Sequence, residues 1–427
     1  MQNRVQKKKK ISLTTMIFIA LLAGALAGVI INYLIPSNYV VDDIIVQGVF
    51  YIVGQGFIRL MRMLVVPLVF CSIVCGSMAV GDTKKLGSVG VKTLIFYLCT
   101  TALAITVALS IANIFNPGKG LDMSQIQVTS TVSETTQSMS MTETLLDIIP
   151  VNIFNSLSEG NMLQIIVFAL ILGVILANMG DRVDIVKNFF GQFNDIMMEM
   201  TMAVMKLAPI GVFCLIAKTF AEIGFEVFIP LLKYMFCVLL ALAVQCFVVY
   251  LGLLKIFSGL NPFIFIKNFF PVMAFAFSTS TSNATIPMNI DTLAEKMGVS
   301  KKISSFTIPL GATINMDGTS IMQGVAVVFT AQAFGIPLDM MDYKTVIGTA
   351  TLASIGTAGV PSVGLITLTM VFNSVGLPIE GIALIMGIDR ILDMTRTAVN
   401  ITGDAVCTTI VASWNKAVDR DVYYRRK

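Results

Sequence analysis

The chain has 427 residues, of which 56% are hydrophobic and only 13% are charged, and its mean hydropathy is +0.85. A soluble protein is usually about a quarter charged, so this composition excludes an ordinary soluble domain and predicts a membrane protein. The formal net charge of +4 is too small to predict binding to nucleic acid. The chain has no histidine, which excludes Ser-His and Cys-His nucleophiles, histidine proton relays and HExxH zinc sites.

Six long apolar segments occupy the first half of the chain. The first of them, 11–35, contains no charged residue, and a helix needs roughly 20 apolar residues to cross the hydrocarbon core. This segment is too long for a cleaved signal peptide, so we expect a retained helix. The six predicted spans cover residues 11–35, 46–80, 89–116, 150–178, 195–222 and 226–257.

Lysine and arginine are concentrated in alternate loops, for example at 7–10 and at Lys84 and Lys85. Basic loops of membrane proteins face the cytoplasm, so both termini are predicted to be cytoplasmic. The polar segment 117–148 is then a flexible extracellular loop. The predicted location of the protein is the plasma membrane.

Two later segments, 263–290 and 345–375, are apolar at their ends and polar in the middle. The flanks, of about 10–14 residues, are too short to cross a membrane but suit a hairpin that enters and returns. Non-helical backbone at membrane depth is tolerated only when it is buried in protein or lines a wet cavity. Both segments are therefore predicted to be re-entrant hairpins.

Each predicted hairpin precedes a full span, 303–332 in one case and 378–416 in the other. The loop charges make the two hairpins open to opposite sides, so hairpin and helix form an inverted repeat. Paired interrupted segments of this kind indicate the binding site of a secondary transporter. The predicted fold is an all-α polytopic membrane protein with eight transmembrane helices and two oppositely oriented re-entrant helical hairpins.

A carboxylate lies inside the first of these spans, in the motif NMDGT at 315–319. Asp317 is costly at this depth unless partners or a cation offset its charge. Gly318 beside it suggests that the helix opens here, and free carbonyl oxygens with a carboxylate suit a hard cation. A buried aspartate that hydroxyl groups satisfy is the alternative interpretation.

The last span carries polar residues on one face, within about 100° of one another. They are Asp389, Asp393, Arg396, Thr397, Asn400 and Asp404. If this face lines a cavity, Arg396 can bind a side-chain carboxylate through two parallel hydrogen bonds, and Asp393 can bind an ammonium group. A dicarboxylate has no use for Asp393 and a neutral amino acid none for Arg396, so the pair favours an acidic amino acid. A structural ion-pair network is the competing interpretation.

Four motifs occur in order: a serine-rich hairpin ending in ATIP (284–287), NMDGT, ASIGTAGVP (353–361) and DMTRTAVNITGD (393–404). With them, essentially the whole chain resembles the dicarboxylate/amino acid:cation symporter family, which includes bacterial glutamate transporters and mammalian excitatory amino acid transporters. The resemblance implies a homotrimer in the lipid bilayer that moves aspartate or glutamate with sodium ions by an elevator mechanism. It implies neither enzymatic activity nor an organic cofactor.

The resemblance also implies a scaffold and a mobile transport domain. The segments are scaffold 11–80, transport domain 89–116, extracellular loop 117–148, scaffold 149–222, transport domain 226–416 and cytoplasmic tail 417–427.

For the substrate, the resemblance assigns the side-chain carboxylate to Arg396, with Thr319 and the backbone near Gly364, and the amine to Asp393. The other implied substrate residues, around the α-carboxylate and on the last helix, are Ser280, Thr281, Ser282, Val360, Thr397 and Asn400.

The resemblance further implies three sodium sites. The first comprises Gly311, Asn315, Asn400 and Asp404. The second comprises Thr313, Met316, Ser354, Ile355 and Thr357. The third comprises Tyr97, Thr100, Thr101, Asn315 and Asp317.

Three positions depart from related proteins. Archaeal members carry an arginine where this chain has Ser280, and mammalian members carry one where it has Met394. The proton-carrying glutamate of mammalian members corresponds to Gln323, which cannot titrate, so we expect a cycle that is independent of pH. The alternatives are a proton-coupled or dicarboxylate carrier of the same fold, and a channel.

Overall fold

The structure is a computed structural model that describes residues 13–81, 88–121, 149–224, 228–355 and 363–424. Within them the regular secondary structure is helical, apart from one isolated bridge between Val299 and Val418. The helices of the first half are α1 Leu13–Leu34, η1 Val40–Phe50, α2 Tyr51–Gly81, α3 Ser88–Phe115, α5 Ile153–Glu159, α6 Met162–Met179, η3 Gly180–Val183, α7 Asp184–Met205 and α8 Ala208–Ile223. Those of the second half are α9 Phe228–Val244, η5 Gln245–Tyr250, α10 Leu251–Ser258, α11 Pro262–Thr279, α12 Ser282–Met297, α13 Lys301–Ile314, α14 Asp317–Ala333, α15 Met340–Ser354, α16 Val363–Ser374, α17 Gly381–Trp414 and α18 Arg420–Tyr424.

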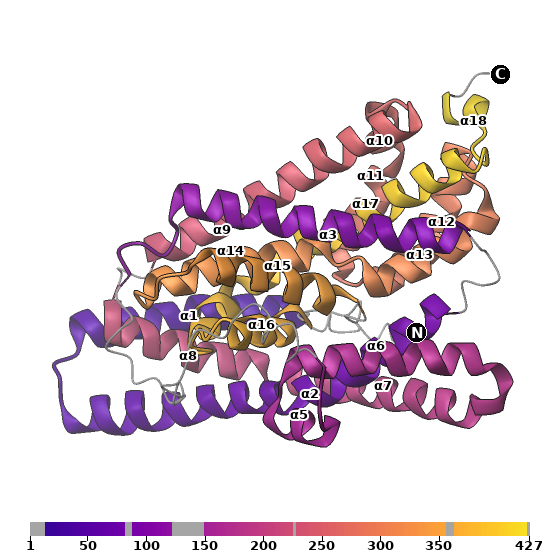
Figure 1. The fold of residues 1–427 in the computed structure, drawn as a ribbon. Helices are drawn as coiled ribbons and strands as arrows, with labels where there is room; N and C mark the ends of the chain where they lie inside the picture. The colour runs from indigo at the N-terminus through magenta and orange to yellow at the C-terminus, as the bar shows by residue number, and fades with distance from the viewer. Residues whose placement is uncertain (1–12, 82–87, 122–148, 225–227, 356–362, 425–427) are drawn as a thin grey trace, which may run out of the picture.

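The helices form two groups, which occupy the lower and upper halves of Figure 1. In the lower group α2 packs on α6, α7 and α8, and α1 packs on α8. In the upper group α17 packs on α9, α11, α13 and α14, while α3 packs on α14. The predicted division into scaffold and transport domain stays a prediction, because helices of the two groups also pack on each other, α17 on α8 and α16 on α2.

Glycine allows the close packing of α1 on α8. A Cβ atom at Gly24 would lie 2.8 Å from the carbonyl oxygen of Phe213, and one at Gly28 would lie 2.5 Å from the Cβ atom of Phe220. The two glycines are four residues apart and therefore lie on one face of the helix. Small residues at this spacing let two apolar helices approach backbone to backbone, as in membrane proteins.

Two predicted spans are wrong as single helices. The span predicted at 150–178 is divided at Gly160, whose positive φ of 72° ends α5 before α6 begins. The span predicted at 195–222 is divided at residues 206–207, and the helix before this division begins earlier than predicted, at Asp184. Pro209 explains the second division, because it has no N–H to donate to the carbonyl group one turn earlier.

By length and composition, six stretches of the described residues can cross a membrane. They are Thr15–Leu34, Val40–Phe57, Val89–Phe115, Gln164–Met205, Phe228–Ser258 and Pro262–Thr279. The helices of the predicted spans 303–332 and 378–416 are not among them. In α17, Asp389, Arg396 and Asp404 are buried by the surrounding helices.

The first predicted hairpin corresponds to α11 and α12, which pack against each other and are joined by Ser280 and Thr281. Both helices are longer than the predicted flanks, at 18 and 16 residues. In the second predicted hairpin α15 and α16 also pack against each other. The centre of that hairpin, 356–362, lies outside the described residues.

The segment 417–424, predicted as a tail, packs on the connections at 258–261 and 298–300. Hydrogen bonds join them: Ser300 N to Ala417 O (3.0 Å), Asp419 N to Gly298 O (2.8 Å), Arg420 Nη2 to Ser258 O (3.2 Å) and Tyr423 Oη to Asn261 O (2.8 Å). Tyr423 is fully buried, and this burial raises the pKa of its phenol, which therefore stays a hydrogen-bond donor. The end of the chain thus braces the α10–α11 and α12–α13 connections.

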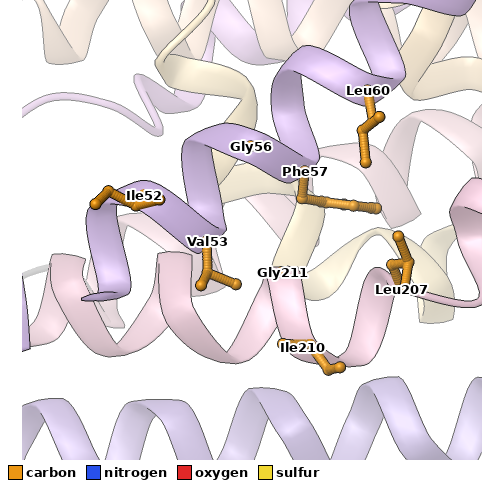
Figure 2. Close-up of a pocket in the computed structure, with 8 residues that line it drawn as sticks. All are labelled: Ile52, Val53, Gly56, Phe57, Leu60, Leu207, Ile210 and Gly211. Atoms are coloured by element: carbon orange, nitrogen blue, oxygen red, sulfur yellow. The ribbon is translucent and has the colours of Figure 1, made fainter. Parts of the chain in front are cut away.

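An apolar pocket of about 420 Å³ lies between α2 and α8 (Figure 2). Phe57 and Leu60 line it from α2, and Leu207 and Ile210 from the start of α8. None of the predicted substrate or cation residues belongs to its lining. The polar groups described next converge elsewhere, around α14 and α17.

Candidate substrate and cation site

The span that carries NMDGT is interrupted. α13 ends at Ile314 and α14 begins at Asp317, while Asn315 and Met316 leave helical geometry with ψ angles of 84° and 46°. The predicted opening of this helix is confirmed, and it lies two residues before Gly318. Such a break frees backbone carbonyl and N–H groups inside the protein, next to the carboxylate of Asp317.

Asp317 is fully buried and hydrogen-bonded through both carboxylate oxygens. Its Oδ1 accepts from the Thr101 hydroxyl at 2.6 Å. Its Oδ2 accepts from the Tyr250 hydroxyl at 2.7 Å and from the Gln245 amide at 3.2 Å. All three partners are neutral, so they solvate the carboxylate without balancing its charge.

Gln245 and Tyr250 were not predicted from the sequence as site residues. They begin and end η5, a π-helical turn between α9 and α10. Gln245 stands out as the only polar side chain in the run 237–248. The same reasoning that selected Asp317 would have found it, because a polar group inside an apolar span requires a partner.

Asp404 is also buried, and its Oδ1 accepts from the Asn315 amide at 2.9 Å. The same amide nitrogen lies 3.4 Å from the carbonyl oxygen of Asn400. A Cβ atom at Gly311 would lie 2.4 Å from Asp404 Oδ1, so only glycine fits there. The first predicted cation set, Gly311, Asn315, Asn400 and Asp404, is therefore gathered at the helix break.

Asn400 connects the two sides of this break. Its Oδ1 accepts from the backbone N–H of Gly318 at 2.7 Å, and its Nδ2 donates to the Met316 sulfur at 3.3 Å. The first turn of α14 is thus attached to α17.

Two buried oxygens at these carboxylates have no hydrogen-bond partner: Gln245 Oε1 and Asn315 Oδ1. The orientation of each amide is fixed, because its nitrogen must face the carboxylate of Asp317 or Asp404. Unpaired acceptors beside buried carboxylates are the environment that a hard cation favours. The residues present therefore fit a hard cation.

Arg396 is only 1% exposed and is held by two carboxylates of its own helix. Its Nη2 lies 2.7 Å from Asp389 Oδ1 and 3.0 Å from Asp393 Oδ1. The polar face predicted for this helix is confirmed, although the pairing of Asp389 with Arg396 was not predicted. Nε and Nη1 of Arg396 are buried without a partner, which leaves donors for an anionic ligand.

Three helices converge at Arg396. A Cβ atom at Gly364 of α16 would lie 2.9 Å from the Thr319 methyl group of α14 and 3.4 Å from Arg396 Nη1. The predicted group of Arg396, Thr319 and Gly364 is therefore brought together. Thr397, one residue further along α17, is buried and donates its hydroxyl to the Asp393 carbonyl at 2.8 Å.

The first hairpin tip carries three predicted residues, and the helices on either side of it both pack on α17. Ser280 has a left-handed backbone (φ 52°), and its buried hydroxyl has no partner. Thr281 is half-buried, and Ser282 is buried at the start of α12. Val360, predicted from the second tip, lies outside the described residues.

The remaining predicted cation residues lie on α3, α13 and α15. On α3, Tyr97 donates to the Thr307 carbonyl at 3.1 Å, and the hydroxyls of Thr100 and Thr101 lie 3.1 and 2.8 Å from the Tyr97 carbonyl. The others belong to the second predicted set. The Thr313 hydroxyl donates to the Leu310 carbonyl at 2.9 Å, and Ser354 and Ile355 are buried at the end of α15. Thr357 lies outside the described residues. The second predicted site stays a prediction.

The chain is similar to known proteins over most of its length. The model of the sodium:dicarboxylate symporter family matches residues 13–414. A proton/sodium-glutamate symport protein of Bacillus caldotenax is 40% identical over 411 residues, which cover 95% of each chain. A proton/glutamate-aspartate symporter of Escherichia coli K12 is 36% identical over 422 residues, or 97% of this chain and 95% of the relative. C4-dicarboxylate transport protein 1 of Ralstonia nicotianae is 33% identical over 372 residues, or 86% of each chain.

The match extends over nearly the whole described chain and includes the helix break, the polar face of α17 and both predicted hairpins. Members of this family are transporters and not enzymes. The chain belongs to the sodium:dicarboxylate symporter family.

Proposed function

We propose that this protein is a sodium-coupled symporter of acidic amino acids, with aspartate, glutamate or both as substrate. The observation that carries the proposal is the environment of Arg396. Its guanidinium is buried, is anchored by two carboxylates through one nitrogen, and has unpaired N–H groups on Nε and Nη1. Relatives whose names include glutamate or glutamate-aspartate symport support the choice of substrate.

In the proposed complex, Arg396 binds the side-chain carboxylate of the substrate beside Thr319 and Gly364. A planar guanidinium with two adjacent free N–H groups suits a carboxylate because both can form parallel hydrogen bonds. Asp393 binds the ammonium group, and Asp389 keeps its contact with Nη2. The predicted residues of the two hairpin tips, from Ser280 to Ser282 and at Val360, then surround the α-carboxylate with Asn400.

The proposed coupling ion is sodium, and Asp317 and Asp404 are the charged ligands of two sites. Both carboxylates are buried with neutral partners, and unpaired amide oxygens lie beside them. A bound cation offsets the cost of burying the charge, which is several kcal/mol for an ion without a counter-charge. The remaining predicted site, around Met316 and Ser354, belongs to the same proposal.

The proposed architecture has eight spans and two oppositely oriented re-entrant hairpins, with both termini in the cytoplasm of the plasma membrane. In it α3 and the helices from α9 to α17 form a transport domain that moves as an elevator against the other helices, within a homotrimer. The packing of α17 against α9, α11, α13 and α14 supports this division.

A dicarboxylate carrier is the second candidate, supported by the C4-dicarboxylate relatives. Asp393 argues against it, because a second buried carboxylate 3.0 Å from Arg396 Nη2 repels a ligand without an ammonium group. Names of other relatives include protons, which makes proton coupling a direct alternative to sodium.

Uptake into proteoliposomes tests the proposal. Labelled aspartate should accumulate under an imposed sodium gradient, and unlabelled aspartate or glutamate should compete far better than succinate. Counterflow of labelled substrate distinguishes a carrier from a channel. Equal uptake in choline under a proton gradient would reject sodium coupling, and stronger competition by succinate would reject the amino acid.

A further inference from the structure

The two carboxylate oxygens of Asp317 have different surroundings. Oδ2 accepts two hydrogen bonds, from Tyr250 and from Gln245. Oδ1 faces the Thr101 hydroxyl at 2.6 Å, but this hydroxyl also lies 2.8 Å from the Tyr97 carbonyl oxygen. A threonine has one hydroxyl proton, and the carboxylate is both the nearer and the stronger acceptor for it. Oδ1 thus accepts its hydrogen bond from α3, the helix of Thr101, whereas both bonds to Oδ2 come from η5.

The π-helical turn η5 brings the two donors to Oδ2. In a regular α-helix, residues five apart such as Gln245 and Tyr250 would point about 140° away from each other. The wider π-turn bonds residue i to i+5 and brings such a pair nearer to one face. π-Turns of one turn inside an α-helix occur frequently at functional sites.

A glycine on α17 gives Tyr250 the room to reach the site. A Cβ atom at Gly403 would lie 2.4 Å from the Tyr250 hydroxyl and 2.7 Å from Asn315 Nδ2. The hydroxyl of Tyr250 thus donates to Asp317 and lies near the Asn315 amide that binds Asp404. Gln245 contributes a second feature, because its nitrogen donates to Oδ2 while its buried Oε1 has no partner.

We infer that Tyr250 and Gln245 are positioning residues for the cation at Asp317, presented by the π-turn. They hold Oδ2, so that Oδ1 is directed at the cation with Thr101, and Gln245 Oε1 is one more oxygen for it. The inference rests on the proposed sodium coupling and extends it to residues of a helix outside the predicted cation sets. A purely structural role, in which the two side chains only solvate a buried carboxylate, is the alternative.

Sodium-dependent thermal stability of the purified, substrate-free protein separates these roles. Sodium chloride is exchanged for choline chloride at constant ionic strength, and the midpoint of unfolding is followed as sodium is added. The test variants are Tyr250→Phe and Gln245→Leu, which remove the donors with little change in volume. The matched control is Tyr423→Phe, which removes a buried tyrosine hydroxyl with a hydrogen bond of 2.8 Å, far along the chain in α18.

Wild-type protein and Tyr423→Phe should respond to the same sodium concentration, although the control unfolds at a lower temperature throughout. Tyr250→Phe should need about tenfold more sodium for half of the stabilisation, the effect of losing one hydrogen bond to a charged group. Gln245→Leu should also need more sodium for half of the stabilisation. If Tyr250→Phe does not fold, Gln245→Leu alone provides the test.

An unchanged sodium requirement in a folded variant of either residue would overturn the inference and leave the proposed function intact. A wild-type protein that sodium stabilises no more than choline would overturn the sodium coupling itself, and the inference with it.

Discussion

Replacement of Arg396 by cysteine tests the proposed substrate recognition most directly. The change removes the guanidinium and leaves a small side chain at a position that is 1% exposed. A bound aspartate would then bury its side-chain carboxylate without a counter-charge, which costs about 3–5 kcal/mol. This free energy corresponds to more than about a hundredfold loss of affinity. A small neutral amino acid such as serine or alanine does not carry that carboxylate and should still bind.

The structure also predicts a side effect of this variant. Asp389 and Asp393 both contact Arg396 Nη2, so the substitution leaves two buried carboxylates without their shared cation. Arg396→Cys should therefore be less stable than the wild type. The double variant Arg396→Cys, Asp389→Asn removes one of these charges and should recover part of the stability without recovering acidic uptake.

The assay is uptake of labelled aspartate, glutamate and serine into proteoliposomes under a sodium gradient, with transporter content measured in each preparation. Arg59→Cys is the matched control, because it makes the same chemical change at an exposed position of α2. The control should transport as the wild type does. Wild-type affinity for aspartate and glutamate in folded Arg396→Cys protein would refute the assignment.

Three further predictions concern the cations, pH and the end of the chain. Asp404→Asn should weaken the dependence of uptake on sodium and leave the fold intact, since Asn315 can still donate to the amide oxygen of the new side chain. Uptake measured at increasing sodium concentration checks this, and a curve identical to that of the wild type would contradict it. Uptake driven by sodium should vary little between about pH 6 and pH 8, because the chain has no histidine and Gln323 cannot titrate. An influx of protons in proportion to substrate uptake, measured in liposomes loaded with a pH-sensitive dye, would contradict it. Truncation before Asp419 removes three hydrogen bonds to the 258–261 and 298–300 connections, each worth about 1 kcal/mol. It should lower the unfolding temperature, and a shift in the sodium or aspartate requirement would show that this segment does more than brace the fold.

Polar residues in apolar spans made the centre of the site predictable from the sequence. Asp317, Arg396 and Asp404 are costly at membrane depth, so each of them requires a partner or a ligand. Helical periodicity then put the polar residues of α17 on one face, as observed. The break near Gly318 followed from the same cluster of polar residues.

The partners of these charges could not be predicted in the same way. Periodicity groups Asp389 and Asp393 near Arg396 but does not decide that both contact one nitrogen. The contact of Tyr250 with Asp317 joins residues 67 apart in the chain and depends on a π-turn, which the apolar pattern of its helix does not signal. The divisions at Gly160 and before Pro209 were missed, although Glu159 and Asn161 flank the first and Lys206 lies at the second.

The arrangement of α14 and α17 explains how the proposed cation and substrate sites influence each other. The N–H of Gly318 donates to Asn400, and a Cβ atom at Gly318 would lie 2.8 Å from the Arg396 carbonyl oxygen, so the start of α14 rests on the turn of α17 that carries Arg396. Across the break, Asn315 bonds Asp404 and lies 3.4 Å from the Asn400 carbonyl. A cation that orders this bend therefore also fixes the helix start beside the guanidinium. Because such linkage is reciprocal, substrate must raise the affinity for the cation by the same factor as the cation raises the affinity for substrate.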